Sequence, residues 1–244
     1  MRVVLLFLIL LSANSVALPK ALNCASDHFA PYVLELDGEI RGINIDLVKR
    51  AAAMLGIEMN FVLVPWKRLE LDLEQKEFDC VVAYFRTRER EAYMHFTQVP
   101  IQFTSYNLFV SQGRLKPGWS LEQLHGWRIA YHRGFLIPSQ LTGLGAKGKI
   151  YLVPVQNDEQ AMGMLHKGRI DALITNKAVG EHILRHNDWP GIEAVSPALS
   201  FTPAFLVFAR TDELAPLVAR FDEALFRLLY DGSYLEIKQR YQPD

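Results

Sequence analysis

A threonine and an arginine that follow an apolar segment have the chemistry of an anion site. Thr87 comes directly after the predicted strand 78–85, and its hydroxyl can cap a helix that begins at Arg88. The free N–H groups of a helix start attract anions. The planar guanidinium of Arg90 can hold a carboxylate through two parallel hydrogen bonds. Charges alternate along residues 86–91, however, and on these residues alone a solvated face with i,i+3 charge pairs is the better interpretation.

Length, composition and charge limit the kind of protein. The 244 residues are 50% hydrophobic and 22% charged, which excludes a disordered or fibrous chain and leaves room for one or two domains. Lys+Arg 26 against Asp+Glu 27 gives a formal charge of -1, so nucleic acid is not expected as a partner. No serine-hydrolase elbow, Gly-x-Ser-x-Gly, is present, and no enzymatic activity is predicted.

The first residues have the features of a signal peptide. Arg2 precedes an unbroken apolar run, residues 3–11, and Ser15 and Ala17 are small residues at the positions that a signal peptidase reads. That run is far shorter than the roughly 20 residues that cross a bilayer. Residues 1–17 are therefore predicted to be removed after about Ala17, and the mature protein is expected in the periplasm as a monomer.

Short apolar strands alternate with helical patterns, which predicts an α/β fold with mainly parallel sheets. Asn44 is expected to cap a helix that stops before Gly56. Asn157 and Gln160 have the spacing of a capping box. Two lobes, each with its own sheet, are predicted rather than one long sheet. The predicted strands are residues 59–64, 78–85, 128–131, 150–155 and 170–175, and the predicted helices are residues 44–55, 157–167, 214–230 and 234–241.

Several short motifs occur together in the order and spacing of a known family. The motifs are Phe29-Ala-Pro-Tyr32, Gly42-Ile-Asn-Ile-Asp46, Phe78-Asp79, Thr87-Arg-Glu-Arg90, Gly168-Arg-Ile-Asp171 and Asp231-Gly-Ser-Tyr234. In this respect the chain resembles the periplasmic solute-binding proteins of the amino-acid-binding family, bacterial extracellular solute-binding protein family 3. The resemblance implies the type II periplasmic-binding-protein fold, with lobe 1 at residues 18–106 plus 204–244, lobe 2 at residues 107–203, and two crossover strands. A ligand would lie between the lobes.

The resemblance also assigns roles to single residues. Arg90, with Thr87 at the same helix start, would grip the carboxylate of the ligand. Phe29 and Trp66 match the aromatic walls of the family's cleft, and Tyr84 is a weaker candidate. Core packing is the alternative for each aromatic side chain.

Three departures from the family pattern affect the expected ligand. Ser26 and Asn176 stand where the family often has the acidic residues that hold an ammonium group, and Gly134-Phe-Leu136 replaces a turn that often reads Gly-Thr-Thr. His132 and Arg133 lie beside that turn and are predicted to supply cationic donors instead. We therefore expect a small carboxylate-bearing solute, either an amino acid or a related organic acid.

Cysteines and histidines are the remaining reactive side chains. Cys24 and Cys80 lie on strands that are neighbours in the resembling fold. The sequence therefore allows either a disulfide or two buried free thiols. His182 and His186 stand one helical turn apart, but zinc needs three or four protein ligands. No metal or other cofactor is predicted.

Three functions are compatible with these residues. The first is a transport receptor that captures a solute and presents it to the membrane permease of an ABC transporter. The second is a dehydratase of the prephenate or arogenate type on the same scaffold, which would need a general acid such as Asp27, Glu35 or His132. The third is a sensing module that docks on a membrane receptor. The transport receptor is the expected function.

Overall fold

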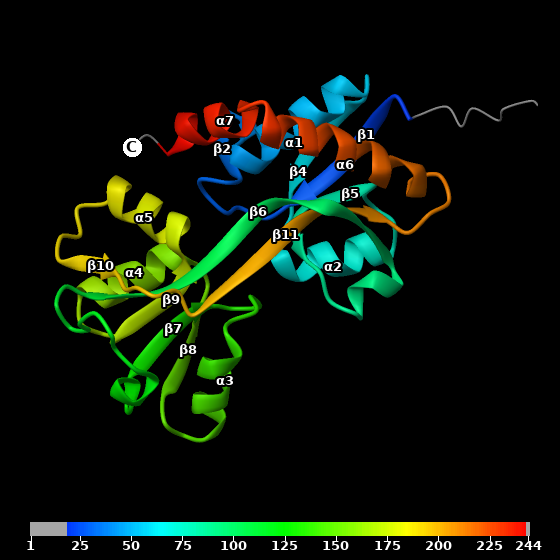
Figure 1. The fold of residues 1–244 in the computed structure, drawn as a ribbon. Helices are drawn as coiled ribbons and strands as arrows, with labels where there is room; N and C mark the ends of the chain where they lie inside the picture. The colour runs from blue at the N-terminus through cyan, green and yellow to red at the C-terminus, as the bar shows by residue number, and fades with distance from the viewer. Residues whose placement is uncertain (1–18, 243–244) are drawn as a thin grey trace, which may run out of the picture.

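The computed structural model describes residues 19–242, so the predicted signal peptide lies outside the described residues. These residues form two α/β lobes joined by two long strands, β6 (Met94–Ser111) and β11 (Ser200–Ala209), which cross the middle of the molecule (Figure 1). Within residues 19–242, no helix combines the length and the apolar character needed to span a membrane.

The first lobe contains the start and the end of the described chain (Figure 1). Its elements are β1 (Ala21–Ser26), the hairpin β2 (Leu34–Leu36) and β3 (Glu39–Arg41), α1 (Ile43–Met54), β4 (Glu58–Leu63), α2 (Trp66–Glu74), β5 (Cys80–Phe85), the 3-10 turn η1 (Arg90–Ala92), α6 (Ala215–Tyr230) and α7 (Ser233–Tyr241). The second lobe contains η2 (Leu121–Leu124), β7 (Arg128–His132), α3 (Ser139–Ala146), β8 (Tyr151–Val155), α4 (Asp158–His166), β9 (Ala172–Asn176), α5 (Lys177–His186) and β10 (Ile192–Ala194).

Strand pairing connects the two lobes. The order is β4-β1-β5-β11-β6-β9-β7-β8, with parallel pairs at both ends and antiparallel pairs around β6 and β11. The prediction of two separate sheets is therefore corrected, because β11 pairs with β5 of the first lobe and with β6, and β6 pairs in turn with β9 of the second lobe. The predicted lobe boundaries, at residues 106/107 and 203/204, fall inside these two strands. Their position remains a prediction.

Each lobe encloses its own apolar core. The core of the first lobe packs α1 and α6 against the sheet through side chains such as Leu47, Phe208 and Phe221, all with no measurable exposure. The second lobe divides its core between two smaller clusters, one around Leu108 and Ile129 and one around Phe109 and Leu173. Burying such a side chain stabilises the fold by about 2 kcal/mol, so each lobe is held by its own contacts.

A disulfide joins two neighbouring strands of the first lobe. Cys24 on β1 and Cys80 on β5 are direct register partners with Cα atoms 4.5 Å apart, and their sulfurs are bonded. Of the two alternatives left open by the sequence, the structure shows the bridge.

The four helices predicted at residues 44–55, 157–167, 214–230 and 234–241 occur, with one wrong cap. Asn157 caps α4 as expected, because its Oδ1 accepts the Gln160 N–H at 2.7 Å. Asn44, in contrast, does not cap α1. Gly42 is the N-cap residue, with a φ of 127° and with backbone atoms of Tyr32 where a Cβ would lie, so only glycine fits there. This start places Asn44 inside the first turn of α1, where its side chain is fully buried and turned toward β6.

Candidate ligand-binding cleft

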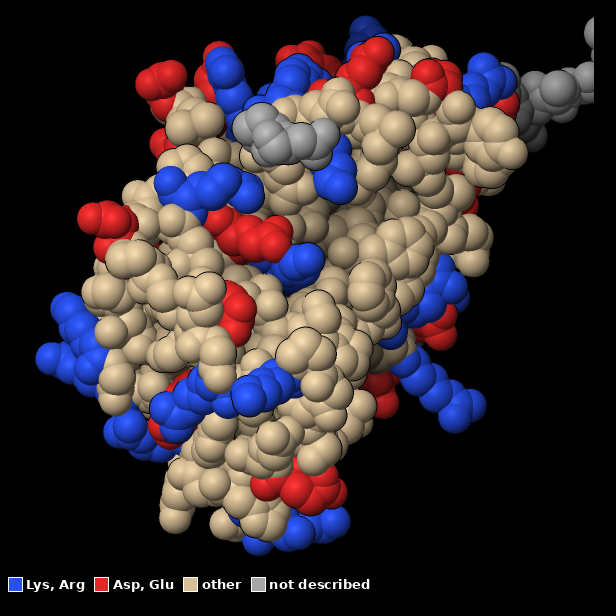
Figure 2. Space-filling view, turned by 60° about the vertical axis from the view of Figure 1, so that its left-hand side comes forward, with Lys and Arg blue, Asp and Glu red and all other residues tan. Residues whose placement is uncertain are grey.

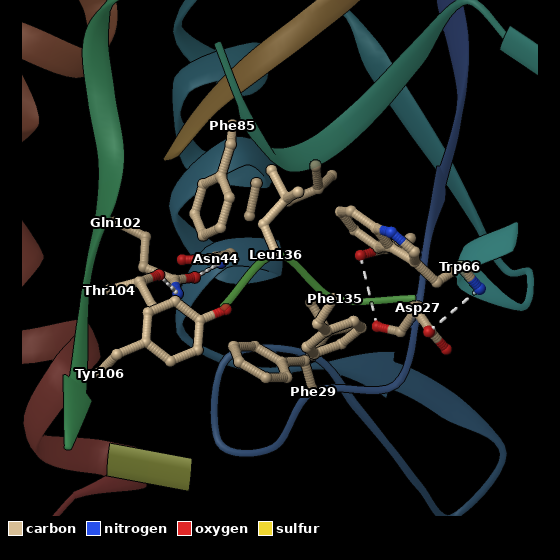
Figure 3. Close-up of a pocket in the computed structure, with 14 residues that line it drawn as sticks. Asp27, Phe29, Asn44, Trp66, Phe85, Gln102, Thr104, Tyr106, Phe135 and Leu136 are labelled. Atoms are coloured by element: carbon tan, nitrogen blue, oxygen red, sulfur yellow. Dashed lines mark hydrogen bonds between the residues drawn. The ribbon is translucent and has the colours of Figure 1, made fainter. Parts of the chain in front are cut away.

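A cavity lies between the lobes at the ends of β1 and β5, and Figure 2 shows the molecular surface hollowed between the two halves. It has about 50 Å³ of space for the centres of water molecules. Fourteen residues line it (Figure 3): Ser26, Asp27, Phe29, Val33, Asn44, Trp66, Val82, Ala83, Phe85, Gln102, Thr104, Tyr106, Phe135 and Leu136. The lining is mostly aromatic and aliphatic, which is typical of a site for a small organic molecule.

One phenyl ring of the second lobe closes this cavity. Phe135 packs edge-on against Phe29 and Trp66 of the first lobe (Figure 3), with ring centroids 5.7 Å and 5.3 Å apart. It also stacks on His132, with ring centroids 4.0 Å apart. The turn Gly134-Phe-Leu136 was expected only to lack hydroxyl groups. It instead supplies an apolar wall, so the two lobes are in contact across the cavity.

A buried chain of polar side chains crosses the opposite wall (Figure 3). Asn44 Nδ2 donates to Gln102 Oε1 at 2.6 Å, and Gln102 Nε2 donates to Thr104 Oγ1 at 2.9 Å. Asn44 Oδ1 is buried and has no hydrogen-bond partner among residues 19–242. An acceptor in this state costs about 1–3 kcal/mol relative to a bonded one.

Asp27 holds the aromatic wall in place. Its carboxylate accepts the backbone N–H of His28 at 2.8 Å and that of Trp66, the first residue of α2, at 3.1 Å. The second bond satisfies one of the free N–H groups of the helix start. Asp27 is also the only charged residue among the fourteen that line the cavity.

Arg90 lies outside the lining of the cavity and is already paired. Its side chain is 8% exposed; Nε donates to Glu70 Oε1 at 3.1 Å, and Nη1 donates to the carbonyl of Phe85 at 3.0 Å. The guanidinium carbon lies 4.0 Å from the centre of the Tyr84 ring. That Arg90 binds the carboxylate of a ligand remains a prediction. Such a carboxylate would approach a guanidinium that already donates to Glu70 and to the Phe85 carbonyl.

The hydroxyl oxygen of Thr87 accepts the backbone N–H of Arg90 at 3.3 Å, but Thr87 is not the N-cap residue, because Glu89 precedes the turn η1. The predicted helix from Arg88 is wrong, because only the three-residue 3-10 turn η1 forms there. So short a turn presents few aligned N–H groups, and the anion site expected from the sequence is correspondingly weak.

Glu70 links the arginine to the surrounding aromatic side chains. Its carboxylate accepts hydrogen bonds from the Tyr93 hydroxyl at 2.7 Å and from Arg90. Partial burial alone would raise the pKa of Glu70, but the bonds from Tyr93 and Arg90 outweigh it and hold that pKa below its ordinary value.

The other predicted first-lobe residues take different positions. Phe29, Trp66 and Ser26 line the cavity. Tyr84 lies behind Trp66, with ring centroids 4.9 Å apart, and its buried hydroxyl has no partner in the described part of the chain. Burial raises the pKa of the Tyr84 hydroxyl, so it stays protonated at neutral pH.

The predicted residues of the second lobe do not line the cavity. His132 reaches it only through Phe135, on which it stacks. Arg133 is exposed and bonds Val155 through its backbone N–H. Asn176 is buried, and its Oδ1 accepts the backbone N–H groups of Ala178 and Val179 at the start of α5. Their ligand contacts remain predictions that a further closing of the cleft would have to produce.

Sequence reasoning missed most of the cavity's polar wall. Gln102, Thr104 and Tyr106 alternate along β6 and so point to one side of the strand. This period of two was a usable signal. Asn44 offered no such signal, because an asparagine near the start of a helix is typical of an N-cap residue.

A second cavity, of about 260 Å³, also has Phe29 in its lining. It includes His28, His132, His182 and His186, together with Asp158. Burial, with smaller contributions from neighbouring cations, lowers the pKa of His182 to about 4. In the described range 19–242, no three histidine, cysteine or acidic side chains are arranged to hold a metal ion.

A glycine pattern of the dinucleotide-binding type also occurs, at Gly143, Gly145 and Gly148. These glycines lie at the C-terminal end of α3, before β8. A dinucleotide turn instead connects a strand to the start of a helix, so this pattern forms no phosphate site.

A family comparison matches the chain over residues 22–244 to the bacterial extracellular solute-binding proteins, family 3. The chain belongs to this family. Among curated relatives, a probable amino-acid ABC transporter-binding protein of Haemophilus influenzae is 20% identical, over 86% of this chain and 79% of the relative. A histidine-binding periplasmic protein of Escherichia coli is 23% identical, over 94% of this chain and 90% of the relative.

Solved structures show the fold of this family-3 protein. An ancestral arginine-binding protein bound to arginine superposes with a TM-score of 0.79 at 23% identity, over 92% of this chain and 99% of the other. A histidine kinase sensor domain with similarity to periplasmic binding proteins has a TM-score of 0.78 at 22% identity, over 92% and 96% of the two chains. The type II periplasmic-binding-protein fold is thereby confirmed.

Proposed function

We propose that this protein captures a small solute in the cleft between its lobes and delivers it to the membrane permease of an ABC transporter. The observation that carries the proposal is the joint cavity, in which Phe135 of the second lobe closes on Phe29 and Trp66 of the first. Ligand contacts from both lobes favour the closed arrangement over an open one, which is the coupling that a capture protein requires.

The sequence predicts a carboxylate-bearing solute on Arg90. Such a solute would bind through the guanidinium N–H groups of Arg90 that the bonds to Glu70 and to the Phe85 carbonyl leave free. His132, Arg133 and Asn176 would then contribute from the second lobe. Which class of solute binds can be measured directly.

Binding in the cleft is tested with the mature protein. Native mass spectrometry of protein purified from the periplasm should show a copurified small molecule. Calorimetry with amino acids, keto acids, dicarboxylates and small amines should identify a class that binds at 1:1 stoichiometry and makes the protein more compact in small-angle X-ray scattering. Failure of every class to bind, with no copurified molecule, would overturn the proposal.

Export and assembly are tested on the same preparation. N-terminal sequencing should begin after about Ala17, and light scattering should give the mass of a monomer. A protein that retains residues 1–17 in the cytoplasm would contradict the periplasmic role.

We propose no catalytic step. Of the general acids considered for a dehydratase, Glu35 is exposed on the hairpin β2, and His132 lies outside the cavity lining. Asp27 is occupied with two backbone N–H groups. Turnover of prephenate, followed by absorbance, should be absent.

A further inference from the structure

We propose that the cleft selects a solute whose body is uncharged and apolar, and that Phe135 is the residue that determines this selectivity. The body here means the part of the solute beyond its carboxylate. The inference rests on the proposed capture function and narrows the solute class of the same cavity.

The first step is that the polar part of the lining is largely covered. Its five neutral polar residues are each at most 5% exposed: Ser26, Asn44, Gln102, Thr104 and Tyr106. Three of them bond to one another, since Asn44 donates to Gln102 and Gln102 donates to Thr104. A polar body would therefore lose its hydrogen bonds to water and gain few new ones in the cleft.

The second step concerns charge. No lysine or arginine is among the residues that line the cavity, and Asp27 is its single charged member. Both carboxylate oxygens of Asp27 accept a backbone N–H, one from His28 and one from Trp66, and Figure 3 shows the carboxylate turned toward the Trp66 backbone. A charged body would lose its hydration without gaining a dedicated counter-ion, which is far more costly than the desolvation of an apolar body.

The third step is that apolar groups of both lobes supply the surface that a solute can reach. Phe29 and Trp66 of the first lobe are partly exposed, as is Phe135 of the second lobe, and Leu136 is exposed (Figure 3). Removal of this surface from water favours a solute body that is itself apolar.

Phe135 is the decisive ring because it belongs to the lobe that closes. Phe29 and Trp66 stay with the first lobe, whereas Phe135 reaches them from a turn of the second lobe. An apolar body that contacts Phe135 as well as the first-lobe rings stabilises the closed arrangement. A polar or charged body lacks that contribution, so the closed arrangement is favoured less by such a solute.

The test compares probes that share a headgroup and differ in the body. Leucine, asparagine and aspartate have side chains of nearly the same shape, and norleucine and lysine compare a linear side chain without and with a cation. The pair 5-methyl-2-oxohexanoate and 2-oxoglutarate repeats the comparison on a 2-oxo acid. In each series that binds, calorimetry at pH 7 should show the apolar member binding at least tenfold more tightly. A smaller or reversed preference would overturn the inference.

A matched pair of variants tests the part played by Phe135. Phe135→Thr should lower the ratio of apolar to polar or charged affinity at least fivefold in the series that binds. Phe201→Thr makes the same change at a 70% exposed ring of β11 that does not line the cavity, and it should leave the ratio unchanged. A general loss of affinity cancels in this ratio. An unchanged ratio in Phe135→Thr, or equal changes in both variants, would contradict the role of Phe135.

The two levels of the proposal fail differently. Binding of polar or charged probes with exclusion of apolar ones would overturn the inference and keep the capture function. If no probe binds but a molecule copurifies, its identification by mass spectrometry decides, because an uncharged apolar body supports the inference and any other body contradicts it. Binding of no probe, together with no copurified solute, would overturn both.

Discussion

The two lobes build their sides of the cleft in different ways. In the first lobe, Asp27 accepts the backbone N–H of Trp66 at the start of α2, and Glu70 accepts a hydrogen bond from Arg90. In the second lobe, the cavity wall is the turn Gly134-Phe-Leu136, where Leu136 is 53% exposed. The first side is organised before a ligand arrives, whereas the second is an apolar wedge on a loop. Preorganisation on one side lowers the entropy lost on binding.

The largest expected effect is on the lobe that carries the disulfide. Replacing Cys24 and Cys80 by alanine should lower the free energy of unfolding by about 3 kcal/mol, because the bridge restricts the unfolded chain. Urea denaturation with and without reductant measures the change. If the double variant is as stable as the oxidised protein, the bridge is not what distinguishes the first lobe.

Arg90→Ala should also destabilise the first lobe. The change leaves Glu70 and the Phe85 carbonyl without their donor, which we expect to lower the free energy of unfolding by about 2 kcal/mol, less than a fully buried pair because Glu70 is 44% exposed. Thermal unfolding at pH 7 measures it. Arg88→Ala, in the same turn, is the control. If Arg90→Ala keeps full stability but no longer binds any solute, the arginine instead has the role expected from the sequence, which is to bind the carboxylate of the ligand.

Phe135→Ala tests what the second lobe contributes to ligand binding. Removal of the ring abolishes its contacts with Phe29 and Trp66, so ligand affinity should fall about tenfold or more while stability changes little. Calorimetry reports the affinity, and scattering reports a less compact protein. Tyr151→Ala, at an exposed ring of the same lobe, should do neither. If the affinity of Phe135→Ala is unchanged, the Phe135 ring does not contribute to ligand binding.

The smallest effect concerns pH. The folded pKa of His182, about 4, lies below its ordinary value of 6.5, so the unfolded chain binds more protons between these values. Stability should therefore decline as pH falls from 6.5 to 4. His182→Gln should remove about 1 kcal/mol of that decline, a figure reduced for the partial exposure of the ring. Urea titrations at pH 7 and pH 4.5 measure the difference, and an identical decline in the variant would contradict it.

Local signals predicted most of the strands and helices. Asn157 caps α4 because the cap oxygen and the N–H that donates to it are three residues apart in any chain. The Asn44 prediction was wrong for a non-local reason, since backbone of Tyr32 occupies the space beside Gly42 and moves the helix start there. The family resemblance located Phe29 and Trp66 at the cleft, but it could not show that Phe135 would fill the space between them.

The amino-acid order alone determined the alternation of strands and helices and the family, because periodicity and short motifs depend on near neighbours. Tertiary structure alone decided which charged groups beside the cleft are paired. Glu70 and Arg90 are 20 residues apart, on α2 and in the turn η1, and they meet only when both pack beside β5. Whether a charged side chain is free or paired depends on which distant group shares its burial, and no local pattern records that.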